Sequence, residues 1–147
     1  MHYLDRVEAI LRQVSLRNDA PQLLAIRLAP DMFDSALQFA IAIRFAARAV
    51  CPPTGRAAPD IPKQRSCQTL LTYKADIASL IRPIRAKDLA QPVAHQAGQA
   101  VLTQSAADYV IRFGLPNMLF HMCMGYAGLR HGGLPIGKSD FDGLHVY

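Results

Sequence analysis

From Asp31 to Cys51 the sequence is almost continuously apolar and rich in Ala, Leu and Ile. A helix that is apolar on nearly all sides is stable in water only when other elements surround it. Pro30 directly precedes the run, and proline suits the first turn of a helix because the missing N–H would have no partner there. This segment therefore predicts a central helix around which the rest of the chain packs.

The same run is too short and too charged for a membrane span. A span needs about 18–20 uninterrupted apolar residues, whereas Arg44 and Arg48 interrupt the longest apolar stretch, residues 39–50. Residues 1–14 mix charged and apolar side chains, unlike a secretory signal, in which an unbroken apolar stretch follows the first charges. We therefore expect a cytoplasmic protein without a membrane segment.

Three further segments have the three- and four-residue spacing of apolar side chains that marks one face of a helix. They are residues 2–14, residues 66–82 and a long segment that begins at Ser105. Gly132 and Gly133 end the last one, since glycine commonly follows a helix C-terminus. We therefore predict an all-α chain whose residues 1–147 form a single helical domain.

The connections between these helices are less regular. Residues 18–21 break the first helix or begin a short new turn. Residues 52–63 contain four prolines and are expected to be irregular. Residues 84–103 are ambiguous: within them, residues 93–103 alternate weakly between apolar and polar side chains and include Gly98, which fits a short β-hairpin or an ordered loop. The apolar residues of the tail, 136–147, are expected to pack back on the bundle.

The net charge of +5 does not indicate a specific nucleic-acid partner. Acidic residues interrupt the basic clusters, and no aromatic residues alternate with them; net charge alone concerns solubility and non-specific association. The three cysteines, Cys51, Cys67 and Cys123, are widely spaced and form no C-x-x-C pair. In a reducing compartment they are most simply buried, small apolar residues.

Pro116 lies inside the last predicted helix. Proline removes one backbone hydrogen bond and its ring clashes with the carbonyl four residues earlier, so we expect a kink that opens space between the helices. Asn117 and His121 follow one turn apart and share a face. A polar pair beside a helix defect in an apolar bundle predicts the lining of a pocket.

His121 is the candidate acid/base catalyst, because the ordinary pKa of histidine lies near working pH. Asp31, at the start of the central helix, is the candidate that orients the His121 imidazole. His131, at the end of the last helix, is expected to cap that helix, and the remaining histidines, His2, His95 and His145, show no ligand spacing. Six further side chains are candidates for binding a substrate. They are Asn117, Tyr109, Gln38, Met124, Phe120 and Phe33.

These residues also have structural interpretations. A lone buried histidine can be hydrogen-bonded to a carbonyl or a carboxylate without any catalytic role. Asn117 can cap the carbonyls that Pro116 frees, and Asp31 can stabilise the positive end of a helix dipole. Arg44 and Arg48, one turn apart, either extend to solvent or anchor an anionic ligand.

Three runs, in order along nearly the whole chain, carry a family resemblance. They are RLAPDMF from Arg27, LPNMLFH from Leu115 and LRHGGLPIGKSDF from Leu129. These runs resemble signatures of the DUF1993 family, a family of unknown function within the DinB-like superfamily. The resemblance implies a DinB-like four-helix bundle, often a homodimer.

The resemblance also implies a metal site that this sequence does not retain. Many DinB-like proteins bind a divalent metal through one histidine of the second helix and an H-x-x-x-H pair of the last. His121 stands at the second position of that pair, Asn117 stands at the first, and the second helix has no histidine. Asn is a poor replacement for imidazole around zinc or nickel. We therefore expect neither a metal nor another cofactor.

Three classes of function follow. The favoured one is a metal-independent enzyme that catalyses isomerisation, elimination or cyclisation of a small organic molecule held between the helices. The second is a non-catalytic, dimeric ligand-binding or interaction protein in which the polar residues only satisfy buried groups. The third is a metal- or thiol-dependent transferase, as some DinB-like proteins are.

Overall fold

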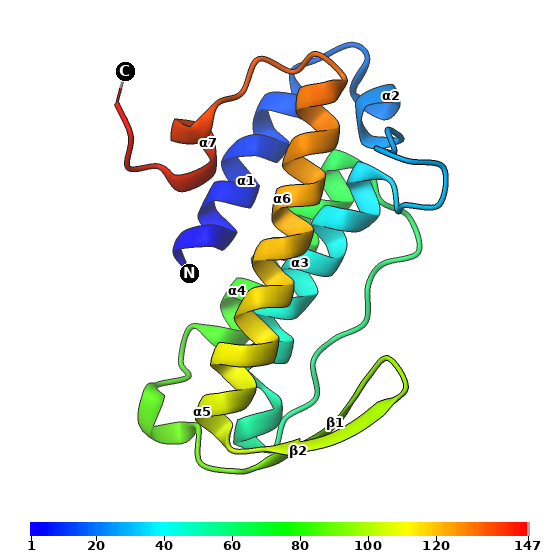
Figure 1. Ribbon diagram of the computed structural model, residues 1–147. Coiled ribbons are helices and arrows are strands. Elements are labelled where there is room, and N and C mark those ends of the chain that lie inside the picture. The colour runs from blue at the N-terminus through cyan, green and yellow to red at the C-terminus, as the bar shows by residue number, and fades with distance from the viewer. Residues whose placement is uncertain (147) are drawn as a thin grey trace.

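The computed structural model describes residues 1–146 and is a helical bundle with one small sheet (Figure 1). Its four longest helices are α1 (His2–Ser15), α3 (Ser35–Val50), α4 (Cys67–Ile81) and α6 (Leu115–His131). Helix α3 packs against both α6 and α4, and α4 packs in turn against α1. The predicted helical bundle is confirmed. Within the described part of the chain, no helix is both long and apolar enough to cross a membrane.

Short elements complete the bundle. Helix α2 (Ala20–Leu24) confirms the short turn predicted after the first helix, and two 3-10 turns, η1 (Pro52–Thr54) and η2 (Ala86–Asp88), interrupt the connections. In the tail, Leu144 and Val146 are exposed, so the expectation that they pack on the bundle is wrong, and residue 147 lies outside the described residues. Helix α7 (Lys138–Asp142), by contrast, lies against α1 as expected. Its Phe141 ring packs against Tyr3 and Tyr126.

Helix α3 is the central helix that the sequence predicts, with eleven of its sixteen residues buried. It begins later than expected, at Ser35. The carboxylate of Asp34 accepts a hydrogen bond from the Leu37 N–H at 2.7 Å and caps the helix. A cap of this kind satisfies one of the free N–H groups at a helix start. Pro30 and Asp31 therefore lie in the loop before α3.

Helix α6 and Gly114, the residue directly before it, approach α3 closely because glycine, which has no side chain, stands at the two points of contact. A Cβ atom on Gly114 would lie 2.6 Å from the Cβ and 2.8 Å from the Cα of Ala49. A Cβ atom on Gly125 would lie 2.9 Å from the ring of Phe39. Real side chains do not tolerate such distances, so these glycines set the separation of the two helices.

Strands β1 (Val93–Ala97) and β2 (Ala100–Gln104) form an antiparallel hairpin, one of the two structures predicted for residues 84–103. Gly98 in the turn has a φ of +61°, a conformation that favours glycine. The hairpin lies at the end of the bundle where α3 ends and the last long helical segment begins (Figure 1).

That last segment starts with the hydroxyl of Ser105, which accepts a hydrogen bond from the Asp108 N–H. It continues as α5 (Ala106–Asp108), a six-residue π-helical segment η3 (Tyr109–Gly114), and α6. The distortion expected around Pro116 thus lies directly before the proline, as a wider helical turn. Such π-helical turns are frequent at functional sites because they redirect side chains.

Candidate functional site

His121 lies half-buried on α6 and faces α3. Its Nδ1 is 2.7 Å from Oε1 of the buried Gln38. An amide oxygen only accepts hydrogen bonds, so this contact places a proton on Nδ1 and the lone pair on Nε2. The Phe45 ring is nearly parallel to the imidazole, with 6.0 Å between the centroids. Burial lowers the pKa of His121 below its ordinary value of 6.5, so the ring is neutral near pH 7.

The second ring nitrogen of His121 is not used inside the described chain. Nε2 has no hydrogen-bond partner among residues 1–146. The one side-chain polar atom in this range that is both buried and unpartnered is Nδ1 of His95. Nε2 of His121 therefore remains accessible, with its lone pair free to accept a proton.

The Asn117 side chain is hydrogen-bonded to the backbone of its own helical segment. Its Nδ2 donates a hydrogen bond to the carbonyl of Phe113 at 2.7 Å. This carbonyl belongs to the last turn of η3, just before Pro116. The contact agrees with the structural interpretation, in which Asn117 caps a carbonyl at the helix defect. Oδ1 and the second N–H of its amide remain available to a ligand.

Of the remaining candidates, Gln38 and Phe120 contact His121, whereas Asp31 does not hold the orienting position that the sequence predicts. Asp31 is exposed in the loop before α3, and Gln38 rather than Asp31 contacts Nδ1 of His121. The sequence could not show this, because Asp31 and Gln38 both precede His121 by more than 80 residues. Phe33 and Phe120 are about half-exposed. The Phe120 ring stands edge-on to His121 at 5.1 Å, and Met124 is half-buried further along α6.

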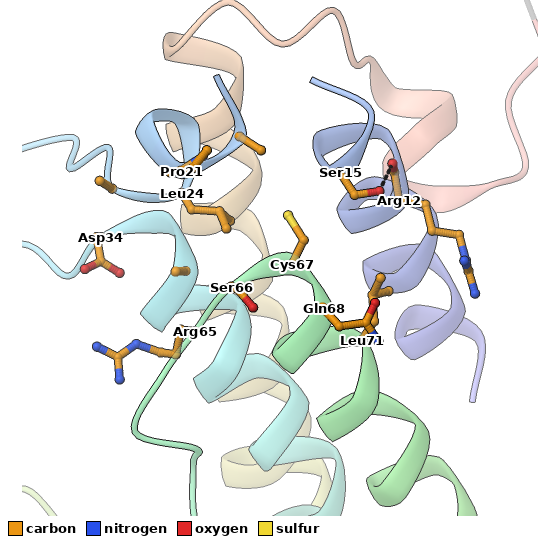
Figure 2. Close-up of a pocket in the computed structure, with 13 residues that line it drawn as sticks. Arg12, Ser15, Pro21, Leu24, Asp34, Arg65, Ser66, Cys67, Gln68 and Leu71 are labelled. Atoms are coloured by element: carbon orange, nitrogen blue, oxygen red, sulfur yellow. Dashed lines mark hydrogen bonds between the residues drawn. The ribbon is translucent and has the colours of Figure 1, made fainter. Parts of the chain in front are cut away.

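Two cavities open at opposite ends of α3, and neither is lined by Asn117 or His121. The larger, of about 650 Å³, lies between the end of α1, α2 and the starts of α3 and α4 (Figure 2). The Cys67 thiol points into it, and burial raises the pKa of that thiol. Its two arginines are already bonded within the chain, Arg12 to Glu8 and Arg65 to the Lys63 carbonyl.

The second cavity, of about 400 Å³, lies between the C-terminal half of α3 and β1. We call it the hairpin cavity. No Asp or Glu lines it. Its lining side chains with polar groups are Arg44, Arg48, His95, Gln96 and Tyr109. Tyr109 is a candidate binding residue of the sequence analysis, and the structure places it at this cavity.

Tyr109 and His95 meet at the base of the hairpin cavity. Tyr109 is 1% exposed, and burial raises its pKa while the neighbouring Arg48 opposes the rise. Its hydroxyl is therefore protonated at neutral pH. The His95 ring stands edge-on to Tyr109 at 5.0 Å, and its Nε2 lies 2.7 Å from Oε1 of Gln104 across the hairpin.

The sequence prediction assigns no role to His95, although the pattern of residues 93–97 indicates its position. Side chains in a strand alternate between its two faces, so Val93, His95 and Ala97 share one face. These three are the less exposed residues of β1. An assignment of residues 93–97 to a strand would therefore have placed His95 toward the bundle.

An aromatic cluster joins His121 to the hairpin cavity. Phe45 contacts His121 on one side and Phe113 at 5.7 Å on another. The centroid of the Phe113 ring lies 4.1 Å from that of His95 and 5.4 Å from that of Tyr109. The predicted catalyst and the cavity that the sequence did not predict thus belong to one packed group of rings.

Comparison with known proteins decides the family. The family model described as Domain of unknown function (DUF1993) matches residues 1–142. The chain belongs to the DUF1993 family. None of the curated proteins matches its sequence. A crystal structure of a DinB family member from Shewanella denitrificans is similar to this DUF1993 chain, with a TM-score of 0.81 and 25% sequence identity. The similarity covers 99% of this chain and 88% of the other, and it confirms the predicted DinB-like bundle.

The residues of this DUF1993 chain do not fit the three-histidine metal site that the resemblance implies. Nδ1 of His121 is bonded to Gln38, and the Asn117 amide to a backbone carbonyl. On α3, the side chain that faces His121 beside Gln38 is the ring of Phe45. Between residues 1 and 146, no three His, Cys, Asp or Glu side chains are grouped so that they could hold a metal ion.

Proposed function

We propose that this DUF1993 protein is a metal-independent enzyme that acts on a small organic molecule, with His121 as its acid/base group. The observation that carries the proposal is the contact of Gln38 with Nδ1 of His121. It fixes the tautomer and presents the Nε2 lone pair, which is how an imidazole is prepared to accept a proton. The lowered pKa of His121 keeps this nitrogen unprotonated at neutral pH.

The hairpin cavity supports the same proposal. Its volume of about 400 Å³ falls within the range of small-molecule sites. The protonated Tyr109 hydroxyl can donate a hydrogen bond to an oxygen of a molecule bound there. His121 does not line this cavity, and the rings of Phe45 and Phe113 connect the two places. Proton transfer with this equipment suits isomerisation, elimination or cyclisation. Asn117, Phe120 and Met124, which lie on α6 within four residues of His121, are the proposed contacts for the rest of a substrate.

The test compares wild-type protein with His121→Gln and His121→Ala. Each is incubated with a small-molecule extract of the source cells, and liquid chromatography with mass spectrometry detects compounds that change in mass or retention. We expect one compound to be converted by the wild type, with or without EDTA, and by neither variant. His131→Gln is the matched control, since His131 is exposed at the end of α6. Conversion by both His121 variants, or its loss with EDTA, would overturn the proposal.

One set of observations favours the second class of function, a non-catalytic interaction protein. Both predicted polar residues of α6 make internal hydrogen bonds, and Phe33, Leu115 and Phe120 are each 43–55% exposed. Exposed apolar side chains of this size occur at protein contacts. This class expects His121→Ala to lower the free energy of unfolding by about 1–3 kcal/mol, the cost of leaving Gln38 unpaired, with no compound converted by any variant.

The homodimer, the single domain and the cytoplasmic location stay predictions, and analytical ultracentrifugation measures the first.

A further inference from the structure

The hairpin cavity contains a positive charge that nothing in the described chain neutralises. Arg48 is half-buried on α3 and lines the cavity. Across residues 1–146, no carboxylate lies within ion-pair distance of its guanidinium. The guanidinium carbon instead lies 4.9 Å from the centroid of the Phe45 ring and 5.5 Å from that of Phe113. Partial burial of an unpaired cation costs free energy, and an anion from outside would remove that cost.

Arg44, one turn earlier on α3, shows the contrast. Its Nη2 donates to Oδ1 of Asp60 at 2.6 Å, and its Nε donates to the carbonyl of Pro59 at 3.1 Å. These bonds hold the proline-rich connection against α3. From the sequence, each arginine either extends to solvent or anchors an anionic ligand. The structure shows that the two differ. Arg44 is bonded within the chain, whereas Arg48 has its charge free.

The groups around Arg48 complete a site for an organic anion. The Tyr109 hydroxyl, buried and protonated, adds a neutral donor beside the guanidinium. The planar guanidinium matches the two oxygens of a carboxylate and can bind both at once. Pro52 and Val93 supply apolar surface for the rest of such a molecule, and no acidic residue lines the cavity to repel it.

We propose that the hairpin cavity binds a small organic carboxylate, held by the Arg48 guanidinium and the Tyr109 hydroxyl. The binding itself does not depend on any catalysis. That the bound acid is the substrate rests on the proposed function. It is supported by Phe45, whose ring contacts both Arg48 and His121, so that an acid anchored on Arg48 sits on the aromatic cluster that contains the catalyst.

The binding test is an NMR titration of the full, isotope-labelled chain. The probes are benzoate, phenylacetate and hexanoate, with benzamide as a neutral molecule of the same shape as benzoate and inorganic phosphate as an anion without an organic body. We expect at least one of the three acids to shift the Arg48 Nε–H signal and the amides of residues 93–96 in a saturable way. Benzamide and phosphate should bind at least tenfold more weakly. Saturable shifts from none of the acids, or equal binding of benzamide or phosphate, would overturn the proposal.

Variants locate the site. Arg48→Gln should weaken binding of the acid at least tenfold, and Tyr109→Phe should weaken it severalfold. Arg82→Gln loses the same charge from an exposed position outside the cavity and should bind as the wild type does. Arg48→Lys keeps the charge but loses the planar donor pair, so an intermediate affinity is expected even if Arg48→Gln disturbs folding. Unchanged affinity in both Arg48 variants would refute the site. His121→Gln should still bind the acid, which separates failure of this site from failure of the catalytic proposal.

Discussion

Replacement of Gly114 by alanine tests the close contact of α6 with α3, on which the geometry of the site depends. Two effects oppose each other. Alanine favours a helix over glycine by about 1 kcal/mol. The new Cβ, however, would lie 2.6 Å from the Cβ and 2.8 Å from the Cα of Ala49. Neither atom belongs to a flexible side chain, so the helices themselves must separate.

Overpacking of this kind costs about 1–3 kcal/mol, and a clash with backbone belongs at the upper end. We therefore expect Gly114→Ala to lower the free energy of unfolding by about 2 kcal/mol, taking the helix propensity into account. For a chain of this length, that loss corresponds to a decrease in Tm of about 4–8 °C. Urea unfolding followed by circular dichroism measures the first quantity, and calorimetry the second.

Two companion variants make the test specific. In Gly132→Ala the new Cβ meets the end of the Ile26 side chain, which can rotate away, so the cost should be clearly smaller. Adding Ala49→Gly to Gly114→Ala removes the nearer of the two clashing atoms and should restore part of the lost stability. A Gly114→Ala protein as stable as the wild type, or equal effects at Gly114 and Gly132, would refute the reasoning about helix separation.

Two further predictions concern ionisable groups. Because the pKa of His121 is lowered in the folded state, the unfolded chain takes up a proton first as the pH falls below about 6.5. Stability should therefore fall from about pH 6.5 downward, and urea unfolding at several pH values should show a smaller fall in His121→Gln; an equal fall would contradict the assignment. Lys74, with a side chain 8% exposed, is bonded to Asp5 at 2.9 Å and Glu8 at 2.5 Å. Thermal unfolding should show a loss of about 3 kcal/mol for the double variant Asp5→Asn, Glu8→Gln, which leaves the ammonium buried and unpaired, but less than about 1 kcal/mol for Lys74→Met. A larger loss in Lys74→Met would contradict this.

The positions of most long helices depend on residues that are close together in the chain, so the sequence predicts them. The apolar spacing of residues 2–14 and 66–82 predicts α1 and α4 to within a residue or two. The apolar run after Pro30 predicts a central helix, and α3 is central. These features depend on the periodicity of neighbouring side chains, which a helix converts directly into a buried face. The start of α3 differs because the Asp34 cap, rather than Pro30, determines it.

The candidate site was only partly predictable. The sequence alone identifies His121 and Asn117 as polar residues beside a helix defect, and the missing histidines indicate why a DinB-like metal site is not expected. The partner of His121 is Gln38, 83 residues away, and the hairpin that carries His95 folds against η3. The alternation of residues 93–97 indicates that His95 faces the bundle, but no local pattern names the partner in either contact, because each contact exists only where two helices or a helix and a strand meet.

The sequence by itself therefore determined the helices, the glycine-marked helix end and the family, since each is written in residues close together in the chain. Only the tertiary structure decided which polar groups are satisfied and which remain free. Arg44 and Arg48 are alike in sequence and one turn apart on α3. Arg44 is paired with the carboxylate of Asp60, whereas Arg48 has no carboxylate partner in the described chain and lies against the rings of Phe45 and Phe113 and beside the Tyr109 hydroxyl. The physical reason is that hydrogen bonding and charge pairing depend on distances across the bundle, which the packing of α3, α6 and the hairpin sets.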